Sequence, residues 1–139
     1  LAFNITPTEV VDRDPTLFDN DRVLLIQDGT PGTRWNFTAN HNINQWRLLA
    51  RINYYGDFYD SEAGGYFDDA LLLDLEAAYT LDENMTFTVG ARNVADEQGC
   101  STSSCGTTPP SALGLPYSQF SPFGFNGAFY YARFTYNLD

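Results

Sequence analysis

Apolar and polar side chains alternate strictly along two neighbouring stretches near the middle of the chain. The odd positions of residues 71–79 are aliphatic or aromatic, whereas the even positions include Asp74 and Glu76. After a polar break at 82–84, the odd positions of residues 85–91 are again apolar. Side chains on a strand point alternately to its two faces, so the pattern predicts an antiparallel hairpin with its charges opposite the apolar side chains.

The same alternation predicts the remaining strands. Residues 33–41, 45–58 and 121–139 each read as one strand, and residues 1–5 read as a short strand remnant. The expected fold is all-β: an antiparallel up-and-down meander of five to six strands.

The predicted connections alternate in length. Short turns fall at 42–44 and 82–84, whereas longer loops fall at 6–32, 59–66 and 94–120. A meander places all its short connections at one end of the sheet and all its long ones at the other. Outer-membrane barrels have this asymmetry, with short periplasmic turns and long extracellular loops. The predicted strands are also about as long as a tilted transmembrane β-strand requires. We therefore expect a segment of a large transmembrane β-barrel.

Composition excludes some classes of protein. The 139 residues carry a net charge of −11 with only 7 basic side chains, which argues against nucleic-acid binding. No apolar run approaches the roughly 20 residues of a membrane-spanning helix. Aromatic residues reach 16%, and Tyr and Trp near strand ends suit a membrane–water interface. The chain begins in what reads as mid-strand without a signal peptide, so we expect it to be part of a longer protein.

Two cysteines, Cys100 and Cys105, lie in the last long loop. Their spacing matches neither a redox C-x-x-C motif nor a zinc site with a second pair. Two interpretations are open: a local disulfide, which implies an oxidising compartment, or two free thiols. We favour the disulfide.

The sequence gives little indication of metal binding or catalysis. The acidic loop 6–32 offers carboxylates for a cation but lacks the spacing of a calcium loop, so we expect a solvated loop and no metal site. The single histidine, His41, has no partner ligands in sequence. No hydrolase, metalloprotease or phosphate-binding motif is present, and we expect neither enzymatic activity nor a cofactor.

Three stretches resemble the C-terminal barrel segment of TonB-dependent outer-membrane receptors. They are residues 33–60 (TRWNFTANHNINQWRLLARINYYGDFYD), 71–98 (LLLDLEAAYTLDENMTFTVGARNVADEQ) and 121–139 (SPFGFNGAFYYARFTYNLD). The order and spacing of the three stretches also match the family. Two features depart from it: Leu138 stands where the family usually has a terminal aromatic residue, and no plug domain or coupling motif is present.

The resemblance implies a function. Such receptors bind a scarce ligand at the cell surface, most often a ferric siderophore, and import it with energy from the TonB complex. Residues 1–139 would be the C-terminal barrel segment, and the plug domain and earlier strands would lie outside this chain. The implied partners are outer-membrane lipid, the plug, the remaining barrel strands, the TonB energising complex and an iron chelate. The implied location is the outer membrane of a Gram-negative bacterium.

In such a barrel the charged face must point into the lumen, because an arginine at the lipid midplane costs about 2–4 kcal/mol. Within it we predict an ion-pair ladder of Arg51, Asp74 and Arg92. Its role is either cross-strand pairing that fixes register or contact with the plug or a ligand pathway, and we favour the first. The polar candidates for the lumen are Arg47, Arg51, Asp57, Asp74, Glu76, Arg92 and Arg133.

A second class of protein fits the same alternation. In a secreted all-β carbohydrate- or ligand-binding module, the leucines of residues 71–75 would be buried in a soluble core. The strict alternation of short and long connections favours the barrel, because sandwiches have crossing connections at both ends.

Overall fold

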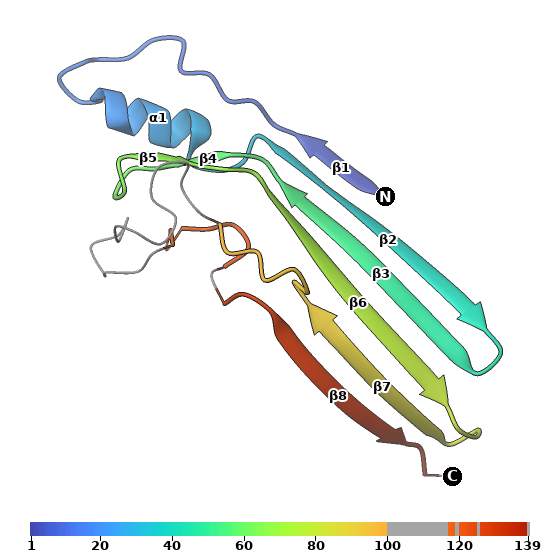
Figure 1. Ribbon diagram of the computed structural model, residues 1–139. Helices are drawn as coiled ribbons and strands as arrows, with labels where there is room; N and C mark the ends of the chain where they lie inside the picture. Colours follow the sequence, from blue (N-terminus) through green and yellow to red (C-terminus); the bar gives the residue numbers. More distant parts are fainter. Residues whose placement is uncertain (100–116, 119, 125, 139) are drawn as a thin grey trace.

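The computed structural model describes residues 1–99, 117–118, 120–124 and 126–138. They form a six-stranded antiparallel sheet, with a small hairpin and one helix at one end of it (Figure 1). In spatial order the sheet strands are β1 (Ala2–Ile5), β2 (Thr33–Ile43), β3 (Trp46–Tyr55), β6 (Ala70–Thr80), β7 (Met85–Arg92) and β8 (Phe129–Tyr136). Sequence neighbours within the sheet are spatial neighbours, which confirms the predicted all-β, up-and-down fold.

Two short turns form close to the predicted positions, the first at residues 44–45 rather than 42–44 and the second at 81–84. Asn44, between β2 and β3, has φ 52°, a left-handed conformation that asparagine tolerates better than most residues. Between β6 and β7, one carboxylate oxygen of Asp82 accepts the backbone N–H groups of Asn84 and Met85, both at 2.9 Å. The two Asp82 bonds hold the turn between β6 and β7 tight, which helps to set the register of these two strands.

The opposite end of the sheet carries the long connections. Between β1 and β2, the segment predicted as a loop contains the helix α1 (Asn20–Asp28). Asp19 caps it by accepting the Arg22 N–H at 2.9 Å. Between β3 and β6, the segment predicted as a loop contains the hairpin β4 (Phe58–Asp60) and β5 (Gly65–Phe67). This end is called the loop end below, and the other the turn end.

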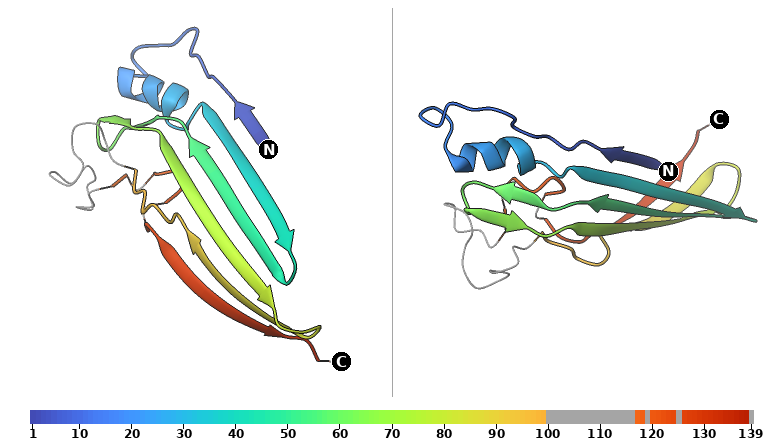
Figure 2. Two further views of the ribbon diagram at one scale, coloured as in Figure 1. Left: turned by 45° about the vertical axis from the view of Figure 1, so that its right-hand side comes forward. Right: turned by 90° about the horizontal axis from the view of Figure 1, so that it is seen from above.

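The largest buried side chains of the described residues gather at the loop end. Phe58 and Phe67 are 1% and 0% exposed, and their rings stack at 5.2 Å between centroids. Along the rest of the sheet, only small side chains such as Ala78 and Thr88 are buried to this degree. Figure 2 shows why: beyond the loop end the described residues form a single layer, and none of them packs as a second layer on the sheet.

The edge strands of the sheet are β1 and β8, as the sequence predicted. Several of the strands differ in length from prediction. β3 ends at Tyr55 because the chain turns away at Gly56, whose N–H donates to the Thr33 carbonyl at 2.9 Å. β8 begins only at Phe129, since residues 121–124 form turns that the alternation did not reveal.

Candidate functional site

The polar face of the sheet is the candidate site. It carries the even positions of β2, β6 and β7 and the odd positions of β3 and β8, as the strand registers require. Six of the seven predicted polar candidates lie on these positions: Arg47, Arg51, Asp74, Glu76, Arg92 and Arg133. Asp57 does not, because it follows the end of β3 and is exposed at the loop end.

Glu76 is the centre of the polar contacts on this face. Its Oε1 accepts from Arg47 Nη2 on β3 at 2.9 Å, and its Oε2 accepts from the Tyr131 hydroxyl on β8 at 2.6 Å. Arg133 Nη2 lies 3.9 Å from the same Oε2. The side chain of Glu76 is only 15% exposed, whereas those of both arginines are about half exposed (47% and 58%). The carboxylate therefore links three strands that are separate in sequence.

Gly90 makes the Tyr131 contact possible. In the registers, Gly90 lies directly between Glu76 on β6 and Tyr131 on β8. A Cβ at residue 90 would collide with the Tyr131 ring, so the ring lies flat over the glycine. Strand β7 is thus crossed by a side chain that joins its two neighbours.

The predicted ladder of Arg51, Asp74 and Arg92 is wrong in its pairing. Arg51 does lie opposite Asp74 in the register. However, the Asp74 carboxylate accepts from Asn53 Nδ2 at 3.3 Å and from the backbone N–H of Asn93 at 2.9 Å. Arg51 turns the other way and donates its Nε to Thr38 Oγ1 on β2 at 3.2 Å. Competition from uncharged donors displaces the expected ion pair, and Arg92 takes no part in the ion pairs of the described residues.

A second polar cluster joins the long connections at the loop end. The Tyr59 hydroxyl donates to Asp21 at 3.1 Å and the Tyr66 hydroxyl donates to Asp28 at 2.6 Å, so the hairpin β4–β5 holds both ends of α1. Burial and the Asp21 carboxylate raise the pKa of Tyr59. The hydrogen bond to Asp28, aided by burial, raises the pKa of Tyr66 to about 12.

The hairpin also reaches the last long connection. Asp60 is 1% exposed and accepts from Ser118 Oγ at 2.5 Å and from the N–H groups of Glu62 and Ala63. Since Ser118 follows β7, and α1 precedes β2, the hairpin β4–β5 fastens all three long connections to one another.

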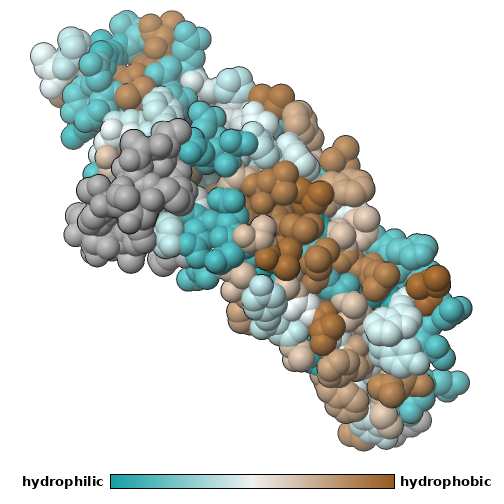
Figure 3. Space-filling view, in the orientation of Figure 1, coloured by the Kyte–Doolittle hydropathy of each residue, from teal (hydrophilic) through white to brown (hydrophobic). Residues whose placement is uncertain are grey.

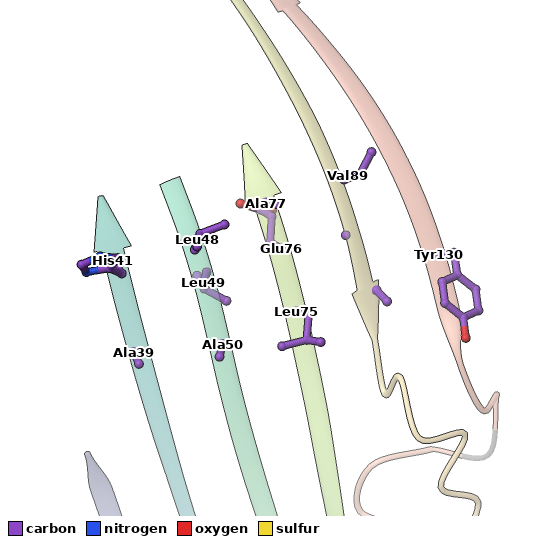
Figure 4. A pocket seen from close by; sticks show the side chains of 12 residues that line it. Ala39, His41, Leu48, Leu49, Ala50, Leu75, Glu76, Ala77, Val89 and Tyr130 are labelled. Carbon is purple, nitrogen blue, oxygen red and sulfur yellow. The ribbon is translucent and has the colours of Figure 1, made fainter. Parts of the chain in front are cut away.

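The opposite face of the sheet is apolar and uncovered. Brown side chains gather over the middle of the sheet in Figure 3. The exposed fraction is 48% for Leu71, 41% for Leu75 and 43% for Val89. Alanines on this face leave a shallow hollow of about 590 Å³, with His41 and Tyr130 at its margins (Figure 4).

Aromatic pairs mark both ends of the apolar face. Trp35 stacks on Tyr54 at 5.4 Å near the loop end, and Trp46 contacts Tyr79 at 4.8 Å near the turn end. Each pair joins residues directly opposite one another on adjacent strands. The apolar surface between them is therefore bounded by two aromatic borders.

The acidic residues of the first long connection serve local structure. Asp14 accepts from the Thr16 N–H and hydroxyl, which lowers its pKa, and Asp12 accepts the Arg13 N–H. The described part of the chain holds no group of three or more side chains arranged to bind a metal. Cys100 and Cys105 lie outside the described residues, so the disulfide stays a prediction. Among the described residues, no helix has the length and apolar character needed to cross a membrane.

Comparison with solved structures gives a fold-level match. A crystal structure of a mutant of the ferric enterobactin receptor PfeA from Pseudomonas aeruginosa superposes with a TM-score of 0.51 at 16% identity. The match covers 76% of this chain and 16% of that receptor chain, so this chain spans a small part of the receptor's length. It supports a barrel-like fold for the sheet. No protein-family profile matches the sequence, and no curated protein sequence matches it.

Sequence reasoning missed two groups on the polar face. Tyr131 shares a strand face with the predicted Arg133, but the sequence does not indicate its partner, because its contact with Glu76 depends on pairing β8 with β7 across a long connection. The sequence also gives no partner for Arg34, whose guanidinium lies 5.8 Å from the centre of the Tyr55 ring. The available signal was an arginine and a tyrosine that share one face of two predicted neighbouring strands.

Proposed function

We propose that the chain is the C-terminal barrel segment of an outer-membrane active-transport receptor. The complete receptor binds a scarce ligand at the cell surface, a ferric siderophore, and imports it with TonB-coupled energy. The fold-level likeness to a ferric enterobactin receptor supports the transport class, and the match of three sequence stretches supports the family.

The observation that carries the proposal is the exposed apolar face between two aromatic borders. On β3, Tyr54 lies eight positions after Trp46, or roughly 27 Å along an extended strand. At the usual strand tilt this distance spans most of the apolar band of about 25 Å on membrane barrels. Tyr and Trp at the two borders fit the aromatic girdles at the membrane–water interfaces.

The polar face then lines the barrel lumen. An arginine facing lipid would cost about 2–4 kcal/mol at the midplane, so burial of Arg47, Arg51 and Arg133 in lipid is strongly disfavoured. Lining the lumen, the polar face would contact a plug domain or a ligand pathway. The free edges of β1 and β8 would pair with the remaining barrel strands, because an uncovered edge exposes unpaired backbone groups.

The loop end would be extracellular, with α1 and the hairpin β4–β5 at the cell surface. A disulfide between Cys100 and Cys105 in the last long loop would suit that oxidising environment. Outer-membrane lipid and the TonB complex complete the proposed partners, the latter acting through parts of the receptor beyond this chain.

A secreted binding module remains the competing function, and one observation weighs against it. It requires the leucines of β6 to be buried in a core, yet Leu71 and Leu75 are each more than two-fifths exposed. Uncovered apolar side chains over this many strands are unusual for a soluble monomer.

Uptake by whole cells tests the proposed transport. Cells producing the full-length gene product would be given labelled ferric siderophores, with and without an intact TonB complex. Uptake of one chelate that stops when the complex is removed is the expected result. Retention in the outer membrane without uptake of any iron chelate would contradict the iron-transport proposal. Recovery of the protein as a soluble secreted species would contradict the barrel itself.

A further inference from the structure

We infer that the polar face carries an anion-binding site centred on Arg34, which contacts an acidic group of the imported ligand. The inference rests on the proposed transport function and narrows its ligand to a negatively charged chelate. The site lies at the loop end of β2, where a ligand entering from outside would first meet the barrel wall.

Three side chains form one row across the sheet. Asn4 on β1 lies opposite Arg34 on β2, and Arg34 lies opposite Tyr55 on β3. The guanidinium lies over the Tyr55 ring, which also contacts the Phe123 ring at 5.4 Å between centroids. A guanidinium that lies over an aromatic ring can still present its N–H edge to a planar acceptor.

Among the described residues, no carboxylate forms an ion pair with Arg34. The ion pairs of the described residues involve Arg47 and Arg133, and both go to Glu76. A guanidinium without a paired acid is well suited to accept a carboxylate, phenolate or phosphate in a bidentate manner. Arg34 therefore differs from the arginines that fasten the strands at the turn end.

Two hollows, each with polar groups in its lining, meet at Arg34. One, of about 410 Å³, also contains Asn36 and Asn53, and the other, of about 270 Å³, adds hydroxyls from the first long connection. Asn4 and Arg34 line both. Amide and hydroxyl groups around a free cation provide the additional donors that an oxygen-rich anion requires.

The distribution of charge over the chain limits anion binding to direct contact with the polar face. Of the 7 basic residues, all of which the structure describes, five lie on the polar face, where the carboxylates are those of Asp74 and Glu76. Most of the 18 acidic residues lie instead in the long connections. The total charge of −11 would repel an anion, so its binding requires direct contact with the polar face rather than long-range attraction.

Substitution of Arg34 in the full-length receptor tests the inference. Outer membranes containing wild type, Arg34→Gln, Arg34→Lys or the control Arg13→Gln would be titrated with two labelled probes. The probes are trianionic ferric enterobactin and a neutral ferric tris-hydroxamate. Arg13 lies in the loop-end connection, where it donates to Asn20 and to the Phe18 carbonyl. Arg13→Gln is the matched control because it removes the same single positive charge as Arg34→Gln. Equal amounts of heat-modifiable barrel would establish that every variant folds.

The wild type should bind the anionic probe more tightly than the neutral one. Arg34→Gln should weaken anionic binding about tenfold or more, Arg34→Lys should weaken it less, and Arg13→Gln should change it less than about twofold. Unchanged anionic binding by Arg34→Gln would overturn the site. Tighter wild-type binding of the neutral probe would overturn the ligand class. Binding of neither probe by the wild type would instead refute the proposed iron-chelate function on which the inference rests.

Discussion

The hydroxyl of Tyr131 donates to Glu76 at 2.6 Å across a glycine that lies between them on the intervening strand. Tyr131 belongs to β8, the last strand, and Glu76 to β6. The contact skips β7, so it fixes the last strand against two others at once. The long connection before β8 does not set the register of this strand, and side-chain alternation alone would allow a shift of two residues.

Substitution of the intervening glycine should loosen the last strand. Gly90→Ala places a methyl group where the Tyr131 ring lies, and we expect a loss of about 1–3 kcal/mol in the free energy of unfolding. Urea titration of the reconstituted full-length barrel measures it. Gly65→Ala is the matched control, because a Cβ at that strand position meets nothing within 4 Å. Equal stability of both variants would show that the ring can move aside without loss.

Removal of the tyrosine hydroxyl should separate the hydrogen bond from the packing. Tyr131→Phe keeps the ring over Gly90 but leaves the partly buried Glu76 with one fewer donor, and we expect a loss of about 1–3 kcal/mol. Tyr130→Phe, whose side chain is exposed on the apolar face, should change stability by less than about 0.5 kcal/mol. The same urea titration compares them. If the two phenylalanine variants lose equal stability, the Glu76 contact contributes nothing specific.

The hairpin β4–β5 should unfold locally when its aromatic stack is removed. Phe58 is 1% exposed and stacks on Phe67, so Phe58→Ala should cost about 3–5 kcal/mol within this unit. Amide hydrogen exchange should then rise in the hairpin and in α1, which the hairpin holds, while β6 and β7 stay protected. Unchanged exchange in α1 would show that the helix does not depend on the hairpin.

Alkaline pH should release α1 from the hairpin. The Tyr66 pKa is raised to about 12 by its bond to Asp28, so the contact is complete below the ordinary value near 10. Its contribution is then lost as the pH rises from about 10 towards 12. Tyrosine ring carbon shifts in NMR follow the titration directly.

Asp28→Asn should move the Tyr66 pKa back towards its ordinary value, because the carboxylate that opposes phenolate formation is gone. Asp12→Asn, at an acid that bonds its neighbour Arg13, should leave the Tyr66 titration unchanged. A Tyr66 that titrates at its ordinary value in the unsubstituted protein would refute the contact.

Alternation of apolar and polar residues was sufficient to predict the six-stranded meander. A strand with one apolar face repeats every two residues, and turns and loops interrupt this repeat. Alternation also placed Arg51 opposite Asp74. Which partner each charge then selects depends on competing donors such as Asn53 and Asn93, and their distances appear only in three dimensions.

The hairpin β4–β5 was missed because its strands have only three residues each, too few for periodicity. A signal was nevertheless present: Phe-Tyr at 58–59 is mirrored by Tyr-Phe at 66–67, and each residue pairs with its mirror image. The Tyr131 contact could not be predicted, since the long connection before β8 leaves its register undetermined by sequence.

The most direct test of the account is which face of the sheet touches lipid. Single cysteines at Leu48 and Leu49, adjacent on β3 with side chains on opposite faces and neither fully buried, would carry a fluorescent label in a full-length barrel with Cys100 and Cys105 replaced by serine. The barrel would be reconstituted in bilayers of brominated lipid, which quenches only fluorophores in contact with acyl chains. We predict strong quenching of the label at residue 48, on the apolar face, and little at residue 49, on the polar face. Stronger quenching at residue 49, or none at either position, would contradict the assignment of the apolar face to the membrane.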